Sequence, residues 1–156
     1  MTTSAYDAIA AFATTIRTRI TDNADTLGDV KQVLDRDEDP AIIAKNASLL
    51  PTICVIPIGE GKDSITFSMG SDDWQHEFSV FIVGYYRFSQ DNKTPYSDIN
   101  TMRQYAFGLL ELFRGADAFF EGGNIYKATV EIKPYQEMDY VLDRFLITMN
   151  VKLIEV

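Results

Sequence analysis

The stretch 74–88, WQHEFSVFIVGYYRF, is the longest apolar and β-prone run in the chain, and it decides the fold. A half-buried strand alternates apolar and polar side chains. This stretch alternates at its start, and from Val80 onward its odd-numbered and its even-numbered residues are both mostly apolar. It therefore predicts a long strand with one solvent-exposed face at its start and with both faces covered at its end. No enzymatic motif lies on it.

Two further strands are predicted from the segments that follow this one. In 126–133, Ala128 and Val130 alternate with polar residues, and 144–156 alternates in the same way over a longer stretch. Such one-face burial is typical of an antiparallel sheet. The ten residues between them, 134–143, are predicted to form a long connecting loop.

The segments that precede it predict a β-hairpin. PTICVIPI (51–58) and DSITF (63–67) flank a glycine-containing turn at 59–62. Residues 30–34, VKQVL, are compatible with either a short strand or a helical turn. The rest of the region 22–50 has no clear pattern, apart from a short helix that Asp39 caps and Pro40 begins.

Two longer helices are predicted from apolar residues at spacings of three and four. The first covers 4–21, and the second begins near Pro95 and ends near Gly115. The chain is thus expected to be one domain (1–156) of the α+β class, with a mostly antiparallel sheet of about four to five strands and two main helices packed on one face. Its core is predicted to contain Phe78, Val80, Ile82, Leu109, Phe113, Ile147 and Met149.

Charge and hydropathy exclude two classes of partner. The formal net charge is −9, which argues against a surface that grips nucleic acid, since such a surface carries clustered Lys and Arg. An acidic wall is nevertheless compatible with DNA sliding past it without binding. No apolar run reaches the roughly 20 residues that a membrane span needs.

Candidate catalytic groups are few. Cys54, inside ICVIPI, is interpreted as a small buried hydrophobe. A nucleophilic thiol needs a base within reach, and the one histidine, His76, lies on the central strand. Carboxylates occur in turns and loops, with no sign of an enclosed pocket that would split their pKa values. We therefore expect no enzymatic activity and no cofactor.

The acidic loop 35–39 has the spacing that opens a calcium-binding loop, with Asp35, Asp37 and Asp39 at alternate positions. An EF-hand needs Gly at the sixth position and Glu at the twelfth, and this chain has Pro40 and Asn46 there. The loop, including Glu38, is predicted to face solvent and to bind no metal.

Six stretches together resemble the tail terminator, or tail-completion, proteins of tailed bacteriophages. They are the first helix ending in IRTRI, LPTICVIPIGE (50–60) with its hairpin, the W-x-H entry at Trp74 and His76 into EFSVFIVGYY, DINTMRQYAFGLLELF, YKATVEIKPY and DRFLITMNVKLIEV. The likeness covers nearly the whole chain except 22–49, and it is one of pattern.

The resemblance implies a virion structural protein that forms a homohexameric ring. Such a ring caps the tail tube, contacts the tube protein, joins the neck or connector, and lets DNA pass through its lumen without specific binding. The apolar surplus of this chain predicts the subunit interface at Phe81, Val83, Tyr85, Phe119 and Phe120. Two alternatives remain open: a neck or head–tail connector protein of the same virion region, and a small cytoplasmic ligand-binding domain or enzyme.

Overall fold

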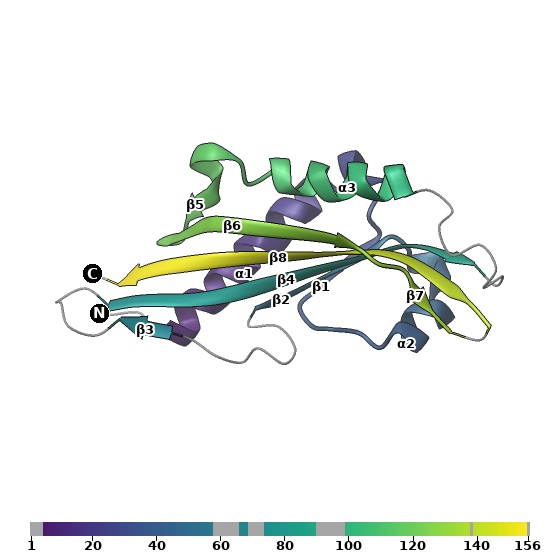
Figure 1. Ribbon diagram of the computed structural model, residues 1–156, viewed down its shortest axis with the longest axis horizontal. Helices are drawn as coiled ribbons and strands as arrows, with labels where there is room; N and C mark the ends of the chain where they lie inside the picture. The colour runs from purple at the N-terminus through teal and green to yellow at the C-terminus, as the bar shows by residue number, and fades with distance from the viewer. Residues whose placement is uncertain (1–4, 58–65, 69–73, 90–98, 138, 156) are drawn as a thin grey trace.

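Two long antiparallel strands, β4 (Trp74–Ser89) and β8 (Val141–Glu155), form the centre of a curled mixed sheet (Figure 1). The structure is a computed structural model, and it describes residues 5–57, 66–68, 74–89, 99–137 and 139–155. β4 matches the predicted stretch almost residue for residue. Its first residue, Trp74, pairs with Glu155, and the pairing continues to the other end of both strands.

Within the described residues the sheet has eight strands, and six of them lie in the order β1-β2-β4-β8-β6-β5. β3 adds to β4, and β7 adds to β8. Only the pairing of β1 with β2 is parallel among the pairs that the described residues make. The remaining bounds are β1 Gln32–Leu34, β2 Thr52–Pro57, β3 Thr66–Ser68, β5 Phe119–Phe120, β6 Gly123–Ile132 and β7 Tyr135–Gln136.

Three α-helices occur in the described part of the chain. They are α1 (Ala5–Asp22), α2 (Pro40–Lys45) and α3 (Ile99–Glu111). Short 3-10 turns follow each of them: η1 (Ala24–Leu27), η2 (Ala47–Leu49) and η3 (Gly115–Ala118). The predicted cap of α2 is confirmed, because the side chain of Asp39 accepts a hydrogen bond from the backbone N–H of Ala41 at 2.9 Å.

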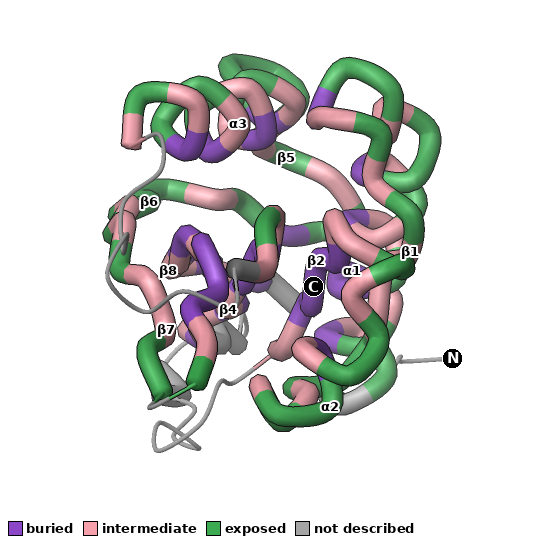
Figure 2. Tube along the Cα trace, turned by 90° about the vertical axis from the view of Figure 1, so that its right-hand side faces the viewer, coloured by how far each residue is buried: buried purple, intermediate pink, exposed green. Residues whose placement is uncertain are grey.

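The larger core lies between one face of the sheet and the helices α1 and α3. Figure 2 shows the buried residues gathered on the central strands and on the side of α3 that faces them. Apolar side chains of α1 at spacings of three and four, such as Phe12, Ile16 and Ile20, are fully buried here. The seven predicted core residues all belong to this cluster, so that prediction is confirmed.

A second, smaller core lies on the opposite face of the sheet. There α2 contributes Ile43, which packs with Cys54, Val83, Tyr85 and Leu142. The β7–β8 hairpin covers the same end, so α2 and β7 lie close together in Figure 1. β4 carries apolar side chains on both faces because both faces are covered. The helices α1 and α3 cover one face, and α2 with the β7–β8 hairpin covers the other.

The predicted fold class is correct only at the level of α+β. The sheet is not a mostly antiparallel sheet of four to five strands with two helices on one face. It is mixed, has more strands, and carries a third helix on its opposite face. β5 and β7, which were not predicted, are two residues long, and β1, which the sequence left open between a strand and a helical turn, has three; such strands are too short for a period-2 pattern to show.

Two predicted connections are also wrong. β2 and β3 do not form a hairpin with each other, because both pair with the same edge of β4, β2 along 80–85 and β3 along 75–77. The turn predicted at 59–62 lies outside the described residues. The predicted loop 134–143 contains the hairpin of β7 with the start of β8, in which Tyr135 pairs with Leu142.

Candidate functional site

Three of the five predicted interface residues lie on β4, on the face of the strand that contributes to the second core. Val83 and Tyr85 are buried within the subunit, 6% and 2% exposed, and Phe81 is half-buried. Burial raises the pKa of the Tyr85 hydroxyl to about 12, and this effect exceeds the opposing hydrogen bond with Arg144. These side chains therefore already have partners inside the chain.

The other two predicted interface residues, Phe119 and Phe120, form strand β5 and face opposite ways. A two-residue turn, Glu121–Gly122, joins β5 to β6 with positive φ at both positions (50° and 75°), as a type I′ hairpin requires. Phe120 turns inward and stacks on Phe12 at 4.2 Å between ring centroids. Phe119 turns outward and is 59% exposed, the largest fraction among the large apolar side chains that the structure describes.

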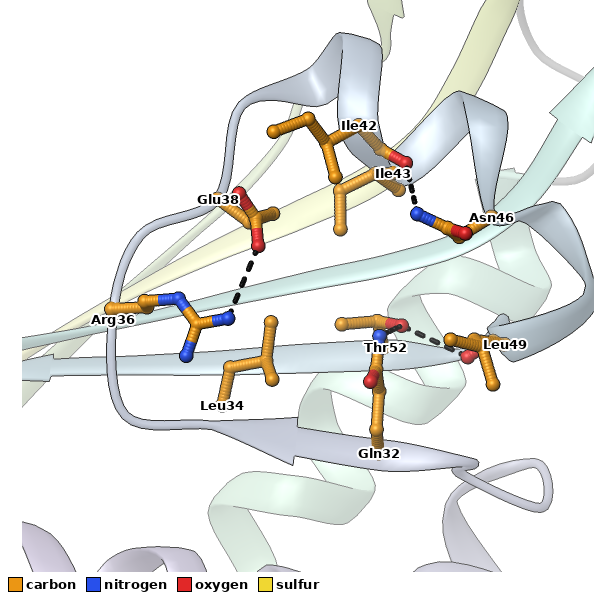
Figure 3. Close-up of a pocket in the computed structure, with 9 residues that line it drawn as sticks. All are labelled: Gln32, Leu34, Arg36, Glu38, Ile42, Ile43, Asn46, Leu49 and Thr52. Atoms are coloured by element: carbon orange, nitrogen blue, oxygen red, sulfur yellow. Dashed lines mark hydrogen bonds and ion pairs between the residues drawn. The ribbon is translucent and has the colours of Figure 1, made fainter.

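A pocket of about 200 Å³ lies between β1, α2 and η2, and we call it the α2 pocket (Figure 3). Figure 3 shows Leu34 of β1 and Ile43 of α2 facing each other across it. Ile42 and Leu49 also line it, and both are more than 40% exposed. The complete lining is Gln32, Leu34, Arg36, Glu38, Ile42, Ile43, Asn46, Leu49 and Thr52.

The polar groups in the wall of the α2 pocket bond to one another. Gln32 donates to the Thr52 hydroxyl at 3.0 Å, and that hydroxyl donates to the Leu49 carbonyl at 2.9 Å. Asn46 donates to the carbonyl of Ile42 at 3.0 Å. The α2 pocket is therefore mixed in character: these polar side chains bond within its wall, and four apolar side chains, Leu34, Ile42, Ile43 and Leu49, are available to contact an apolar group.

The acidic loop forms one rim of the α2 pocket. Asp35, Asp37 and Asp39 are exposed as predicted, whereas Glu38 is only partly exposed and lies 3.5 Å from the Arg36 guanidinium. Arg36 also lies 3.7 Å from Asp35, and its side chain is 64% exposed. The described residues contain no group of three or more acidic, His or Cys side chains arranged to hold a metal ion.

A second hollow, of about 340 Å³, runs between α3 and β6 near the other edge of the sheet. Leu110 of α3 and Phe113, two residues after the end of that helix, line it opposite Ile125 and Ala128 of β6. Tyr126 also lines it and is 46% exposed. The Lys152 ammonium lies over the Tyr126 ring, 4.7 Å from the ring centroid. We call this hollow the α3–β6 groove.

The edge of the sheet beside this groove is open. β5 pairs only with Gly123 and Asn124, so the outer edge of β6 from 125 to 132 has no strand partner among the described residues. At the opposite edge, β1 likewise pairs only with β2 in the part of the chain that the structure describes. An open edge presents unpaired backbone groups and is a template for association.

The candidate nucleophile has no catalytic setting. Cys54 is fully buried in the second core, and burial raises its pKa from 9.0 to about 12, so its thiol stays protonated. Its partner on β4 is Val83, seven positions from His76, which places the two backbones about 23 Å apart along the strand. The interpretation of Cys54 as a buried hydrophobe is confirmed.

No helix in the described residues is both long enough and apolar enough to cross a bilayer. No known family model matches the chain, and no curated protein matches it in sequence.

The α2 pocket was missed by the sequence analysis, although one signal points to it. Ile42 and Ile43 are adjacent in a six-residue helix, and adjacent helical residues point about 100° apart, so both cannot face the core. Phe107 gives a similar signal, because it stands outside the apolar stripe of α3 and is 54% exposed. An apolar residue off the buried stripe marks a surface that another molecule can cover.

Proposed function

We propose that this chain is the subunit of a homohexameric ring that terminates the tail tube of a tailed bacteriophage and joins it to the neck. The observation that carries the proposal is the pair of unlike open edges of the sheet. One is the short parallel strand β1 beside the α2 pocket, and the other is β6 beside the α3–β6 groove.

Two different edges on one subunit favour a head-to-tail contact. In such a contact one surface of each copy meets a different surface of the next, and a closed rotation gives a ring. A symmetric dimer would instead use the same edge twice. Four of the five exposed large apolar residues in the described part of the chain support this arrangement, because they divide between the two edges: Ile42 and Leu49 line the pocket beside β1, and Phe119 and Tyr126 lie on β5 and β6.

The sequence resemblance supports the same class of protein. The stretches that carry it fall on α1, β2, β4, α3, β6 and β8, which together make the larger core and most of the sheet. The segment outside the resemblance, 22–49, holds β1 and α2, which add a second core and the α2 pocket. We infer that this segment adapts a common subunit to its neighbours.

The charge balance suits a ring through which DNA passes. With 23 acidic against 14 basic residues, the subunit lacks the excess of Lys and Arg that would hold a phosphate backbone. A ring with weak affinity for DNA lets the genome move during injection instead of retaining it.

The test uses tail tubes assembled without a terminator. Purified protein is added to them, and electron microscopy measures the fraction of capped ends and the length of tubes grown in its presence. We expect capped ends and arrested growth. Binding to isolated necks or connectors with none to tube ends would instead favour the connector hypothesis. A protein that remains monomeric at every concentration and ignores both structures would overturn the proposal.

A further inference from the structure

We infer that Phe119 of one copy inserts into the α2 pocket of the next copy and is the principal apolar contact between subunits. The inference deepens the proposed function and depends on it for the closure of the ring. It rests on an exposed aromatic side chain and an open pocket with four apolar side chains in its lining, which the same chain carries at opposite edges of its sheet.

The chemistry of the two surfaces is complementary. Phe119 exposes more of its side chain than any other large apolar residue in the described part of the chain. The mouth of the α2 pocket has two further exposed apolar residues, Ile42 and Leu49, and its interior has Leu34 and Ile43. Contact would remove all of these from water, and burial of one aromatic side chain typically supplies a large share of an interface's stability.

The α2 pocket has the size and the apolar side chains to take one phenyl group. Its volume of about 200 Å³ is sufficient for one phenyl group, and its amide and hydroxyl groups already bond within the wall. The Arg36 guanidinium lies at the rim, mostly exposed, and is held by Glu38. A guanidinium in this position can lie against the face of an inserted ring and add a cation–π contact.

Register places the two surfaces on the same face of the sheet. Phe119 pairs with Asn124, which pairs with Lys152, which pairs with Glu77 on β4. Leu34 of the pocket is connected in the same way, through Cys54, to Val83 on β4. Glu77 and Val83 are an even number of residues apart, with no bulge between them, so their side chains lie on the same face of the sheet. Phe119 and Leu34, which are connected to them through paired residues, therefore share that face.

Phe119 and the pocket are too far apart to meet within one subunit. Five strand spacings across the sheet are about 24 Å, and six residues along β4 are about 20 Å, so the path between them along the curled sheet is about 30 Å by ordinary strand dimensions. The phenyl group that enters the pocket must therefore come from a second copy of the chain.

The decisive experiment is selective cross-linking between copies. Two variants, Phe119→Cys and Leu49→Cys, are mixed at tube ends and treated with a short bis-maleimide reagent. The native Cys54 stays in place because it is buried. We expect a mixed dimer at least tenfold more abundant than the product of the control pair, Phe107→Cys with Leu49→Cys. Phe107 is comparably exposed but lies on α3.

A second measurement determines the importance of the contact. Phe119→Ala should leave thermal unfolding unchanged, since the side chain is exposed, and should raise the dissociation constant between subunits at least tenfold. Phe119→Tyr should retain most of the affinity. Rings that form equally well with Phe119→Ala and give no selective cross-link would overturn this contact while the proposed function stands. A wild-type protein that neither self-associates nor caps tubes would overturn both.

Discussion

The ring of Phe145 lies directly over Gly84 on the neighbouring strand, and the two residues are paired in the register of β4 and β8. A Cβ on Gly84 would lie 2.4 Å from the Cζ atom of Phe145, closer than real side chains approach. Tyr86 packs against the same ring at 5.5 Å and donates a hydrogen bond of 2.6 Å to the carbonyl of Leu27. Glycine in the middle of the longest strand thus makes room for an aromatic layer.

Gly84→Ala should therefore destabilise the fold, by about 1–3 kcal/mol, because the added methyl group overpacks a filled core. Gly108→Ala is the matched control. There a Cβ would meet only the Cδ2 atom of Leu27, at an ordinary 3.6 Å, and alanine should stabilise the helix by up to about 1 kcal/mol. Urea unfolding of both variants measures the two free energies. Equal effects of the same sign would contradict this account of Gly84.

Phe113→Ala should cost about 3–5 kcal/mol of unfolding free energy, as deletion of a buried aromatic side chain does. Phe113 is 5% exposed, its ring centroid lies 5.9 Å from that of Phe120, and the Arg19 guanidinium lies 5.2 Å from it. Phe107→Ala, at an exposed position of the same region, is the control and should have little effect. A loss below about 1 kcal/mol at Phe113 would show that this end of α3 is not anchored in the core.

Stability should fall steeply at alkaline pH. Burial raises the pKa of Cys54 from 9.0 and of Tyr85 from 10.0, each to about 12. The folded protein keeps both groups protonated while the unfolded chain releases their protons. Their contribution is therefore full below pH 9 and is lost as the pH rises toward about 12.

The free energy of unfolding, followed from neutral pH to about pH 12 in wild type and in Tyr85→Phe, checks this expectation. The variant should show a shallower alkaline decline. Tyr126→Phe, which removes the hydroxyl of an exposed tyrosine, should follow the wild-type curve. Parallel curves for wild type and Tyr85→Phe would assign the alkaline loss to other groups.

Calcium should not bind to the acidic loop. Asp35 and Asp37 are exposed, the Asp39 carboxylate is engaged in capping α2, and the chain continues into α2 where a calcium loop would need its glycine turn. Calorimetric titration with calcium should give no heat above the dilution blank. A stoichiometric, saturable heat that Asp37→Asn abolishes would contradict the prediction.

Association of the subunits should strengthen with salt. Each copy carries a formal charge of −9, and exposed charges farther apart than the Debye length, about 8 Å at physiological ionic strength, are largely screened. Sedimentation velocity at low and at physiological ionic strength measures the shift toward larger species. Weaker association at higher salt would mean that opposite charges across the contact outweigh the general repulsion.

The central elements were predictable because their patterns are long. Over sixteen residues β4 shows both its alternation and the point at which its second face becomes apolar, and α1 and α3 show their stripes over three turns or more. The parallel partner of β2 was not predictable in the same way. β1 has three residues, and nothing in Gln32–Leu34 distinguishes a parallel from an antiparallel neighbour.

The interface prediction shows a second limit. The apolar pattern at Val83 and Tyr85 correctly indicates that a second face is covered, but a pattern does not identify what covers it. The cover is α2, which belongs to the region with the weakest periodicity. Likewise, the pair Phe119–Phe120 indicates apolar surface, and only the hairpin geometry separates the residue that packs inward from the one that remains exposed.

The position of β8 in the sheet determines the order in which the subunit becomes competent to assemble. β8 lies between β4 and β6, and it is synthesised after both. Until it inserts, β4 and β6 each lack the strand that pairs with both of them. We therefore expect that a nascent chain without β8 does not present Phe119 and the α2 pocket in their final relation, so that competence to assemble waits for the last strand to pair.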